Sequence, residues 1–347
     1  MSWLSTIWIC SLFLPVAGVR AGQRLQIPTL YEAGHFYAVP ETVAGQRLRL
    51  LVDTGGAGGG GRYVINERAA QRLGLKVMPC GVGDDQVDVV PIIPYRDGKS
   101  LPASERPLCD AVALVSKRYG LDSGDDGVLG AGYLPGHVWT FDYPGARLWL
   151  EPASWRSDAG AHRAVLGFQV NRHGGLATGF PRIAIEVDAQ PVDLLLDTGA
   201  TAKPTVAGER ASGTPTVHGI GVTSYITTNV FDRWHKAHPD WRVVADGDDL
   251  LTGKHAARLI EVPEIAVAGW KVGPVWFTER PDANFRKYMS QWMDRPIDGS
   301  LGANALDHFV MTLDYPGRVA WFACVQSCRA ADSDRPPSIH SSIKSSR

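Results

Sequence analysis

Two aspartates occupy matching positions in a tripeptide that occurs twice in this chain. Asp53 begins the sequence Asp-Thr-Gly after the aliphatic residues 50–52, and Asp197 begins the same tripeptide after the aliphatic residues 194–196. A strand that ends in Asp-Thr-Gly holds its carboxylate on a tight turn, because glycine lets the backbone bend and leaves the acid uncovered. Two such carboxylates can face each other in one acid/base site.

Two carboxyl groups in contact suit the hydrolysis of an amide bond. Because both cannot ionise at low cost, they share one proton and titrate as a pair. The ionised group removes a proton from water, and the protonated group donates its proton to the carbonyl oxygen. This chemistry needs neither a metal nor a cofactor, so we predict none for the site.

A second repeated motif indicates that the two halves of the chain are duplicated. The sequence Asp-Gly-Val-Leu-Gly at 126–130 returns as Asp-Gly-Ser-Leu-Gly at 298–302. Residues 126–150 align with residues 298–322 without a gap, and more than half of the aligned positions are identical. Each copy ends in Asp-Tyr-Pro-Gly and an apolar segment, which is typical of a β-hairpin. The repeat predicts two related lobes that contribute one aspartate each.

Length and composition fit two β-rich lobes. The chain has 347 residues, of which 44% are hydrophobic, and its 38 glycines and 23 prolines are interleaved with apolar residues. The repeat predicts an N-terminal lobe at 22–152 and a C-terminal lobe at 164–328. The apolar amino terminus predicts a signal peptide at 1–21, and composition predicts a linker at 153–163 and a disordered tail at 329–347.

Local signals predict two short helices and one long loop. Asn66 is a candidate N-cap for a helix over residues 67–73, and Asn229 precedes a candidate helix over residues 231–236. The stretch 203–221 is rich in Gly, Pro and Thr, so we predict a surface loop there.

These motifs resemble those of the aspartic peptidases, and within that family those of the retropepsin-like branch. The resemblance covers most of both halves and includes the Asp-Thr-Gly turns and the Leu-Gly pairs at 129–130 and 301–302. It implies a mostly β, bilobal aspartic-peptidase fold, with two duplicated retropepsin-like β-barrel lobes and short helices. A single chain would then form an intramolecular pseudo-dimer and act as a monomer.

The resemblance also implies the roles of the site residues. Asp53 and Asp197 would be the catalytic dyad of an aspartic endopeptidase that hydrolyses peptide bonds. The two threonines would cross-link the turns beneath the dyad, and the two glycines would keep the turns free of side chains. The supporting residues are Thr54, Gly55, Thr198 and Gly199.

The first turn departs from the family pattern. Gly56 stands where the family usually has Ser or Ala, and a glycine-rich run continues to Gly61, whereas residues 200–201 are closer to the pattern. We therefore expect the first turn to be unusually mobile. Candidate segments for a substrate-covering flap are residues 81–83 and 246–254.

Two alternative functions follow from the same residues. The chain could retain the fold as a catalytically weak or inactive peptide-binding protein. A paired-carboxylate glycosidase is the other alternative, and its acids would lie roughly 5–9 Å apart. The separation between the carboxyl groups of Asp53 and Asp197 distinguishes these functions.

The amino-terminal segment predicts export. Residues 3–18 are mainly apolar, and the small residues that follow suit signal peptidase, which favours a periplasmic or secreted protein. No Lys or Arg precedes the apolar stretch, so a retained membrane anchor is the alternative.

The cysteines also suit an oxidising compartment. Four cysteines follow the signal segment, and sequence proximity pairs Cys80 with Cys109 and Cys324 with Cys328. Free thiols or a zinc site are the alternatives to these disulfides.

The charge balance disfavours polyanionic partners. Lys and Arg total 35 against 36 Asp and Glu, a formal net charge of −1. A chain without a broad basic field has little attraction for nucleic acid or anionic membranes. The expected partner is a peptide or protein substrate.

Overall fold

The structure is a computed structural model that describes residues 23–57, 62–102, 109–116, 124–251 and 256–331. Strands dominate these residues, which confirms the prediction of a mostly β protein. The strands of the first half are β1 (Leu25–Gln26), β2 (Thr29–Glu32), β3 (His35–Ala38), β4 (Leu50–Asp53), β5 (Tyr63–Asn66), β6 (Met78–Val82), β7 (Asp85–Val90), β8 (Ala113–Ser116), β9 (Gly127–Gly130), β10 (Val138–Asp142) and β11 (Arg147–Glu151).

The second half contains further strands and most of the helical turns. Its strands are β12 (His162–Val165), β13 (Arg182–Val187), β14 (Gln190–Leu196), β15 (Thr201–Ala202), β16 (Gly221–Val222), β17 (Ser224–Thr227), β18 (Val243–Asp248), β19 (Ala257–Val262), β20 (Ile265–Val267), β21 (Trp270–Val272), β22 (Val275–Arg280), β23 (Gly299–Leu301), β24 (Phe309–Asp314), β25 (Val319–Cys324) and β26 (Cys328–Ala330). The helices within the described residues are α1 (Glu67–Arg72), α2 (Val206–Ser212), α3 (Thr228–Ala237), α4 (Ala303–Leu306), the π-helical η1 (Ala283–Tyr288) and the 3₁₀-helical η2 (Met289–Trp292).

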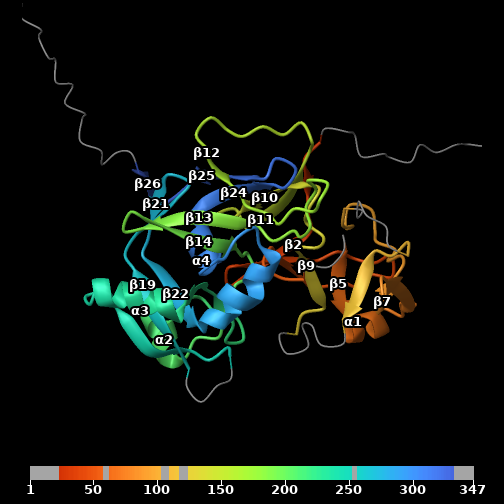
Figure 1. Ribbon diagram of the computed structural model, residues 1–347. Helices are drawn as coiled ribbons and strands as arrows, with labels where there is room; N and C mark the ends of the chain where they lie inside the picture. Colours follow the sequence, from red (N-terminus) through yellow and green to blue (C-terminus); the bar gives the residue numbers. More distant parts are fainter. Residues whose placement is uncertain (1–22, 58–61, 103–108, 117–123, 252–255, 332–347) are drawn as a thin grey trace, which may run out of the picture.

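Each half forms a sheet of its own, and a third sheet joins them. The first half supplies the eight-stranded sheet β2-β3-β4-β9-β5-β8-β7-β6, and the second half supplies the ten-stranded sheet β18-β19-β22-β17-β23-β14-β13-β20-β21-β26. Figure 1 shows these two parts on opposite sides of the molecule. Each aspartate therefore comes from a different sheet.

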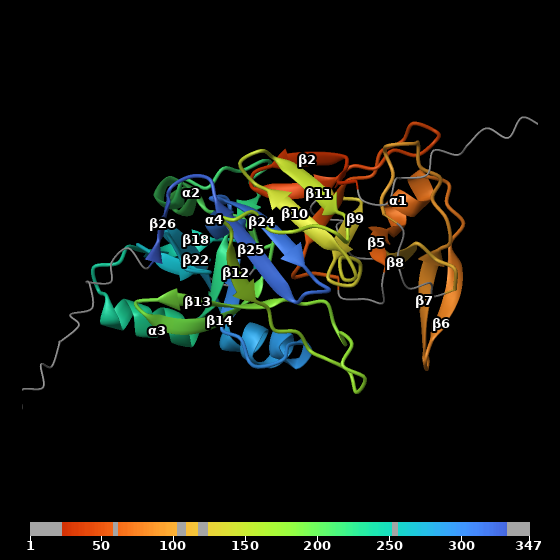
Figure 2. The same cartoon turned by 90° about the horizontal axis from the view of Figure 1, so that it is seen from above.

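The joining sheet has the strand order β1-β11-β10-β24-β25-β12. Its centre is the pairing of β10 with β24, which belong to the two copies of the repeat. Thr140 and Thr312 stand at equivalent positions of the two copies, pair directly and lie 2.7 Å apart between their Oγ1 atoms. Seen from above in Figure 2, this sheet lies between the two halves. The predicted hairpins thus hold the halves together.

The aliphatic runs before the aspartates form central strands. β4 pairs in parallel with β9, and β14 pairs in parallel with β23. Strands covered on both faces read as continuous hydrophobic runs, which explains why neither run alternates with polar residues. Leu50, Val52, Leu194 and Leu196 are all buried in the main core. Rigid central strands therefore carry both acids to the middle of the molecule.

The helix predictions succeed in the first half and need correction in the second. Asn66 caps α1 as predicted, since its side chain accepts a hydrogen bond from the backbone N–H of Ala69. The helix α3 begins at Thr228 with Thr227 as its N-cap, so Asn229 lies inside it. The stretch predicted as a loop contains α2, because Thr205 provides a cap that the Gly and Pro content concealed.

Two predicted boundaries also require correction. His162 and Arg163 belong to β12 rather than to a linker, because that strand pairs with β25. Arg329 and Ala330 belong to β26 rather than to a disordered tail, since that strand pairs with β21. The predicted signal peptide at 1–21 and the rest of the tail lie outside the described residues.

The cysteines form the two predicted disulfides. Cys80 is bonded to Cys109 and Cys324 to Cys328, with Cα–Cα separations of 6.0 and 6.2 Å. In the described part of the chain, no helix has the length and apolar character needed to cross a membrane.

Candidate active site

The two Asp-Thr-Gly turns meet between the halves and bind each other through their threonines. The backbone N–H of Thr54 donates to Thr198 Oγ1 at 3.1 Å, and the N–H of Thr198 donates to Thr54 Oγ1 at 3.0 Å. Each hydroxyl in turn donates to a carbonyl oxygen of the opposite strand, at Leu196 and at Val52. Because all four bonds are buried, they fix the two turns relative to each other.

The glycines let each turn approach the acid of the other half. A Cβ atom built on Gly55 would lie 2.4 Å from Asp197 Cγ, and one built on Gly199 would lie 2.2 Å from Asp53 Cγ. Within each turn the glycine N–H donates to its own aspartate, at 2.8 Å in the first and 3.2 Å in the second. The site therefore has room for two carboxyl groups and for no further side chain between them.

The carboxyl groups of Asp53 and Asp197 form one buried, hydrogen-bonded pair. Each residue is only 8% exposed. Burial raises the pKa of Asp53, and burial together with the neighbouring Asp53 charge raises the pKa of Asp197 well above its usual value. The two carboxyl groups are hydrogen-bonded to each other, so they titrate as one pair that retains a proton above the ordinary aspartate range.

Gly56 has a steric reason to lack a side chain. A Cβ atom there would lie 2.1 Å from Asp53 Oδ2, so a larger residue would displace the acid. The second half has Ala200 after its Asp-Thr-Gly, and the two turns are therefore unequal. The remainder of the glycine-rich run, residues 58–61, lies outside the described residues.

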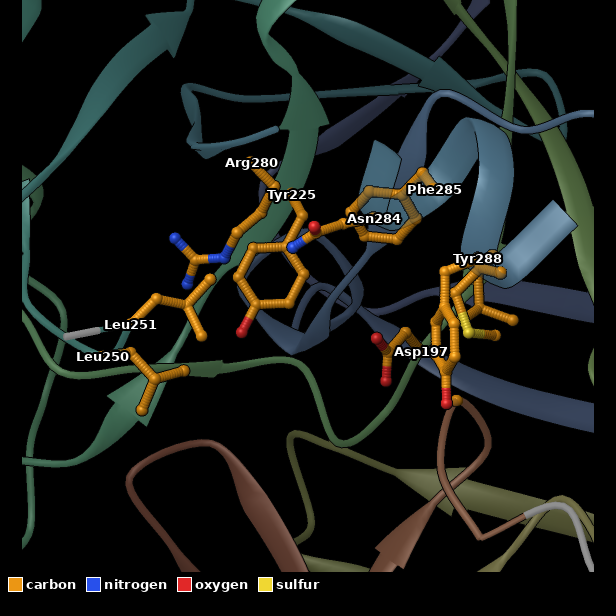
Figure 3. Close-up of a pocket in the computed structure, with 11 residues that line it drawn as sticks. Asp197, Tyr225, Leu250, Leu251, Arg280, Asn284, Phe285 and Tyr288 are labelled. Atoms are coloured by element: carbon orange, nitrogen blue, oxygen red, sulfur yellow. The ribbon is translucent and has the colours of Figure 1, made fainter. Parts of the chain in front are cut away.

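A cavity of about 410 Å³ opens beside Asp197. Figure 3 shows Asp197 between the rings of Tyr225 and Tyr288. The walls of the cavity are mainly apolar. Its lining includes Leu195, Asp197, Tyr225, Arg280, Phe285 and Tyr288. Such a chamber suits an apolar side chain whose backbone lies across the carboxyl pair.

The positive charge of Arg280 in the cavity wall is neutralised within the protein. Arg280 donates to Asp248 Oδ1 at 3.0 Å, and both side chains are almost fully buried. The guanidinium also lies 4.4 Å from the centre of the Tyr225 ring. Because its charge is already paired, Arg280 shapes the cavity more than it attracts an anion.

The two candidate flap segments differ in their relation to this cavity. Leu250 and Leu251, from the segment 246–254, line it, and residues 252–255 lie outside the described part. Residues 81–83 lie at the tip of the β6–β7 hairpin and are absent from the cavity lining. Only the second candidate segment thus reaches the described cavity.

His35 supports the second turn from the opposite half. Its Nε2 lies 3.2 Å from Thr201 Oγ1, and the ring is 1% exposed. A Cβ atom on the preceding Gly34 would lie 2.6 Å from Val222 Cγ2, so the β2–β3 turn packs tightly against β16. Burial, with a smaller effect of the Arg49 charge, lowers the pKa of His35 to about 4.

Sequence reasoning missed the cavity residues and His35. Tyr225, Arg280 and Phe285 are separated in sequence and meet only through the pairing of β17 with β22 and the placement of η1. The repeat does contain one usable signal: Ser300 replaces the apolar residue found at the same position of the first copy, Val128.

The residues described by the structure contain no group of three or more His, Cys, Asp or Glu side chains that could hold a metal ion. The fold and the site together define a mostly β protein whose duplicated halves contribute one aspartate each to a buried carboxyl pair.

Comparison with known proteins adds no family. No family model matches the chain, and no curated protein matches it. Among solved structures, it is similar to the crystal structure of basic 7S globulin from soybean, with a TM-score of 0.45 and 11% sequence identity, covering 90% of this chain and 96% of the globulin chain. A similarity at this level carries no argument about activity.

These findings correct the assignment to the retropepsin-like aspartic peptidases. No family model and no curated protein supports that assignment. The assignment rested on short motifs, which recur without common function, and on a repeat internal to this chain.

Proposed function

We propose that this protein hydrolyses peptide bonds, with Asp53 and Asp197 as its general base and general acid. The observation that carries the proposal is the buried carboxyl pair, which shares a hydrogen bond and is clamped by the reciprocal threonine bonds. A pair that holds one proton has an acid and a base ready in the same place.

At the start of the proposed cycle, Asp53 is ionised and Asp197 is protonated. Asp53, the ionised member, removes a proton from a water molecule, which attacks the peptide carbonyl carbon. Asp197 donates its proton to the carbonyl oxygen. When the C–N bond breaks, Asp53 donates its proton to the amine nitrogen and Asp197 removes a proton from a hydroxyl of the tetrahedral intermediate, so the carboxylic acid product forms and the pair is singly protonated again. The Gly55 and Gly199 N–H groups steady both carboxylates throughout.

The cavity supports a peptide substrate with an apolar side chain next to the cleaved bond. Phe285 and Leu195 provide hydrocarbon surface, and the Arg280 charge is already paired. The direct contact between the two carboxyls disfavours a paired-carboxylate glycosidase, which needs its acids roughly 5–9 Å apart.

A second candidate is a peptide-binding protein with weak or no turnover. The observation that favours it is the lining of the cavity, which includes Asp197 but not Asp53. A peptide side chain could occupy this space without placing its carbonyl between the two acids. Tyr288, which is 65% exposed at the cavity, would support such binding.

Cleavage of a peptide library tests the proposal. We expect the wild-type protein to cut peptides that carry apolar residues, and we expect Asp53→Asn and Asp197→Asn each to lower the rate by at least about 10⁴-fold while remaining folded. Mass spectrometry of the products gives rates and cut positions. Asp188→Asn is the matched control, because Asp188 is an exposed aspartate whose rate effect should be negligible.

The same variants separate the two candidates. Full cleavage by either Asn variant of the pair would refute the acid/base roles. Binding of a library peptide by folded wild-type protein, without cleavage at any pH tested, would favour the peptide-binding protein instead.

A further inference from the structure

We propose that Ser300 is a positioning residue for the carboxyl pair, whose hydroxyl donates a hydrogen bond to the Asp197 carboxylate. The inference deepens the proposed function and rests on it, since it concerns the acids of the same site. The hydrogen bond from Ser300 gives the two acids unequal surroundings, although the halves that carry them are duplicated.

The strand registers place Ser300 on the face of the sheet that carries Asp197. Ser300 of β23 pairs with Leu195 of β14 and with Tyr225 of β17. Directly paired residues project to the same face of a sheet, and alternate residues of one strand do so too. Leu195, Tyr225 and Asp197 line the cavity. Ser300 lies fully buried between the first two, one strand away from the acid.

The first half has a hydrocarbon at the equivalent position. Val128 of β9 pairs with Leu51 of β4 and with Val64 of β5, which repeats the arrangement around Ser300. The two copies of the pentapeptide differ at this position alone. Burying a hydroxyl costs free energy unless it finds a partner, so a site that only needed filling would favour valine. A serine beside one of the two acids therefore points to a polar role.

Asp197 is the acceptor that this hydroxyl approaches. Within the described residues, Ser300 Oγ is buried and has no hydrogen-bond partner at ordinary geometry. Burial and the Asp53 charge raise the pKa of Asp197, and Ser300 acts against both by lowering it. A hydroxyl hydrogen rotates freely, so a small adjustment completes the bond, and bonds to an ionised acceptor are the strong ones.

The titratable and charged groups that face Asp197 are Asp53, Tyr225, Tyr143, His35 and, across the cavity, Tyr288 and Arg280, whose charge is paired with Asp248. Asp53 raises the pKa of Asp197 through its charge. Burial raises the pKa of Tyr225 to about 12 and that of Tyr143 well above 10, so both stay neutral while the pair titrates. His35 is held at the backbone of the second turn, and burial lowers its pKa to about 4. Ser300 is thus a neutral donor to an acid that is repelled by the charge of its partner Asp53.

The bond acts mainly on the loss of the last proton from the pair. In the proposed cycle, Asp197 holds that proton while Asp53 is ionised. A donor to Asp197 stabilises the state in which both acids are ionised, and so lowers the pH at which that state forms. Removing the hydroxyl should raise this upper midpoint.

Carbon-13 NMR titration of the aspartate carboxyl groups tests the inference without any substrate. We expect Ser300→Ala and Ser300→Val to raise the upper midpoint of the pair by about one pH unit. Ser300→Thr keeps a hydroxyl on a side chain of the same shape as valine, so its midpoint should stay near that of the wild type. The Val and Thr variants form a matched pair, and Val128 shows that valine fits the equivalent strand.

Wild-type midpoints in both Ser300→Ala and Ser300→Val would overturn the inference, and so would equal shifts in all three variants, which would indicate altered packing. If either Ser300→Ala or Ser300→Val does not fold, the midpoint of the other is compared with that of Ser300→Thr and gives the same answer. A wild-type protein that cleaves no peptide, but whose midpoint moves as expected, would refute the proposed hydrolysis and leave the Ser300 bond supported.

Discussion

At the scale of single residues, the site depends on the absence of side chains as much as on the two acids. Gly55, Gly56 and Gly199 each approach a carboxyl group so closely that a Cβ atom would collide with it. The glycine-rich first turn, which departs from the pattern of the second, therefore matches a local steric need at Gly56.

Gly199→Ala tests this steric requirement. The added methyl would push Asp53 away from Asp197, and a displacement of about 1 Å in a catalytic group costs on the order of 100-fold in rate. We expect a loss of that size in the rate of peptide cleavage. Gly160→Ala is the control, because a Cβ atom at Gly160 meets no atom within 4 Å. Equal rates for both variants would show that the turn tolerates the methyl group.

At the scale of elements, the β2–β3 hairpin links the first half to the turn that carries Asp197. His35 reaches Thr201 across this contact, and its ring must stay neutral because burial disfavours the charged form. Its pKa falls from 6.5 in the unfolded chain to about 4 in the folded one. The unfolded chain therefore binds more protons between these values, and stability is lost as the pH falls from 6.5 towards 4.

The free energy of unfolding at two pH values tests the role of His35. Between pH 7.5 and pH 5, the His35 shift should remove about 2 kcal/mol of stability from the wild type. We expect His35→Gln to lose that part of the pH dependence, as measured by urea unfolding. His173→Gln changes an exposed histidine and should behave as the wild type. An unchanged pH dependence in His35→Gln would contradict the assignment.

At the scale of the whole molecule, the internal repeat predicts much of the architecture. It predicts the mostly β fold, the hairpins that pair in the joining sheet and the two matching turns, because these features follow from local patterns present twice in the sequence. The sequence likewise predicts Asn66 as a helix N-cap, because its hydrogen-bond partner Ala69 lies only three residues away.

The cavity and the links between halves could not be predicted in this way. Arg280 meets Asp248 and Tyr225 only after β18, β19, β22 and β17 have paired, and no spacing along the chain encodes that meeting. The same holds for His35 and Thr201, which are 166 residues apart in sequence. Non-local strand pairing thus determines the parts of the site that the motifs leave undefined.

The most direct test of the central claim is the pH dependence of kcat/KM for peptide cleavage by the wild-type protein. A pair that works with one shared proton predicts a bell-shaped profile. The rate should fall at low pH, where both acids are protonated, and again at high pH, where the last proton is lost. Because burial and the neighbouring charge raise the pKa of Asp197, the upper limb should lie above the ordinary aspartate value of 3.8. A rate that does not fall on either side of a maximum would contradict the account.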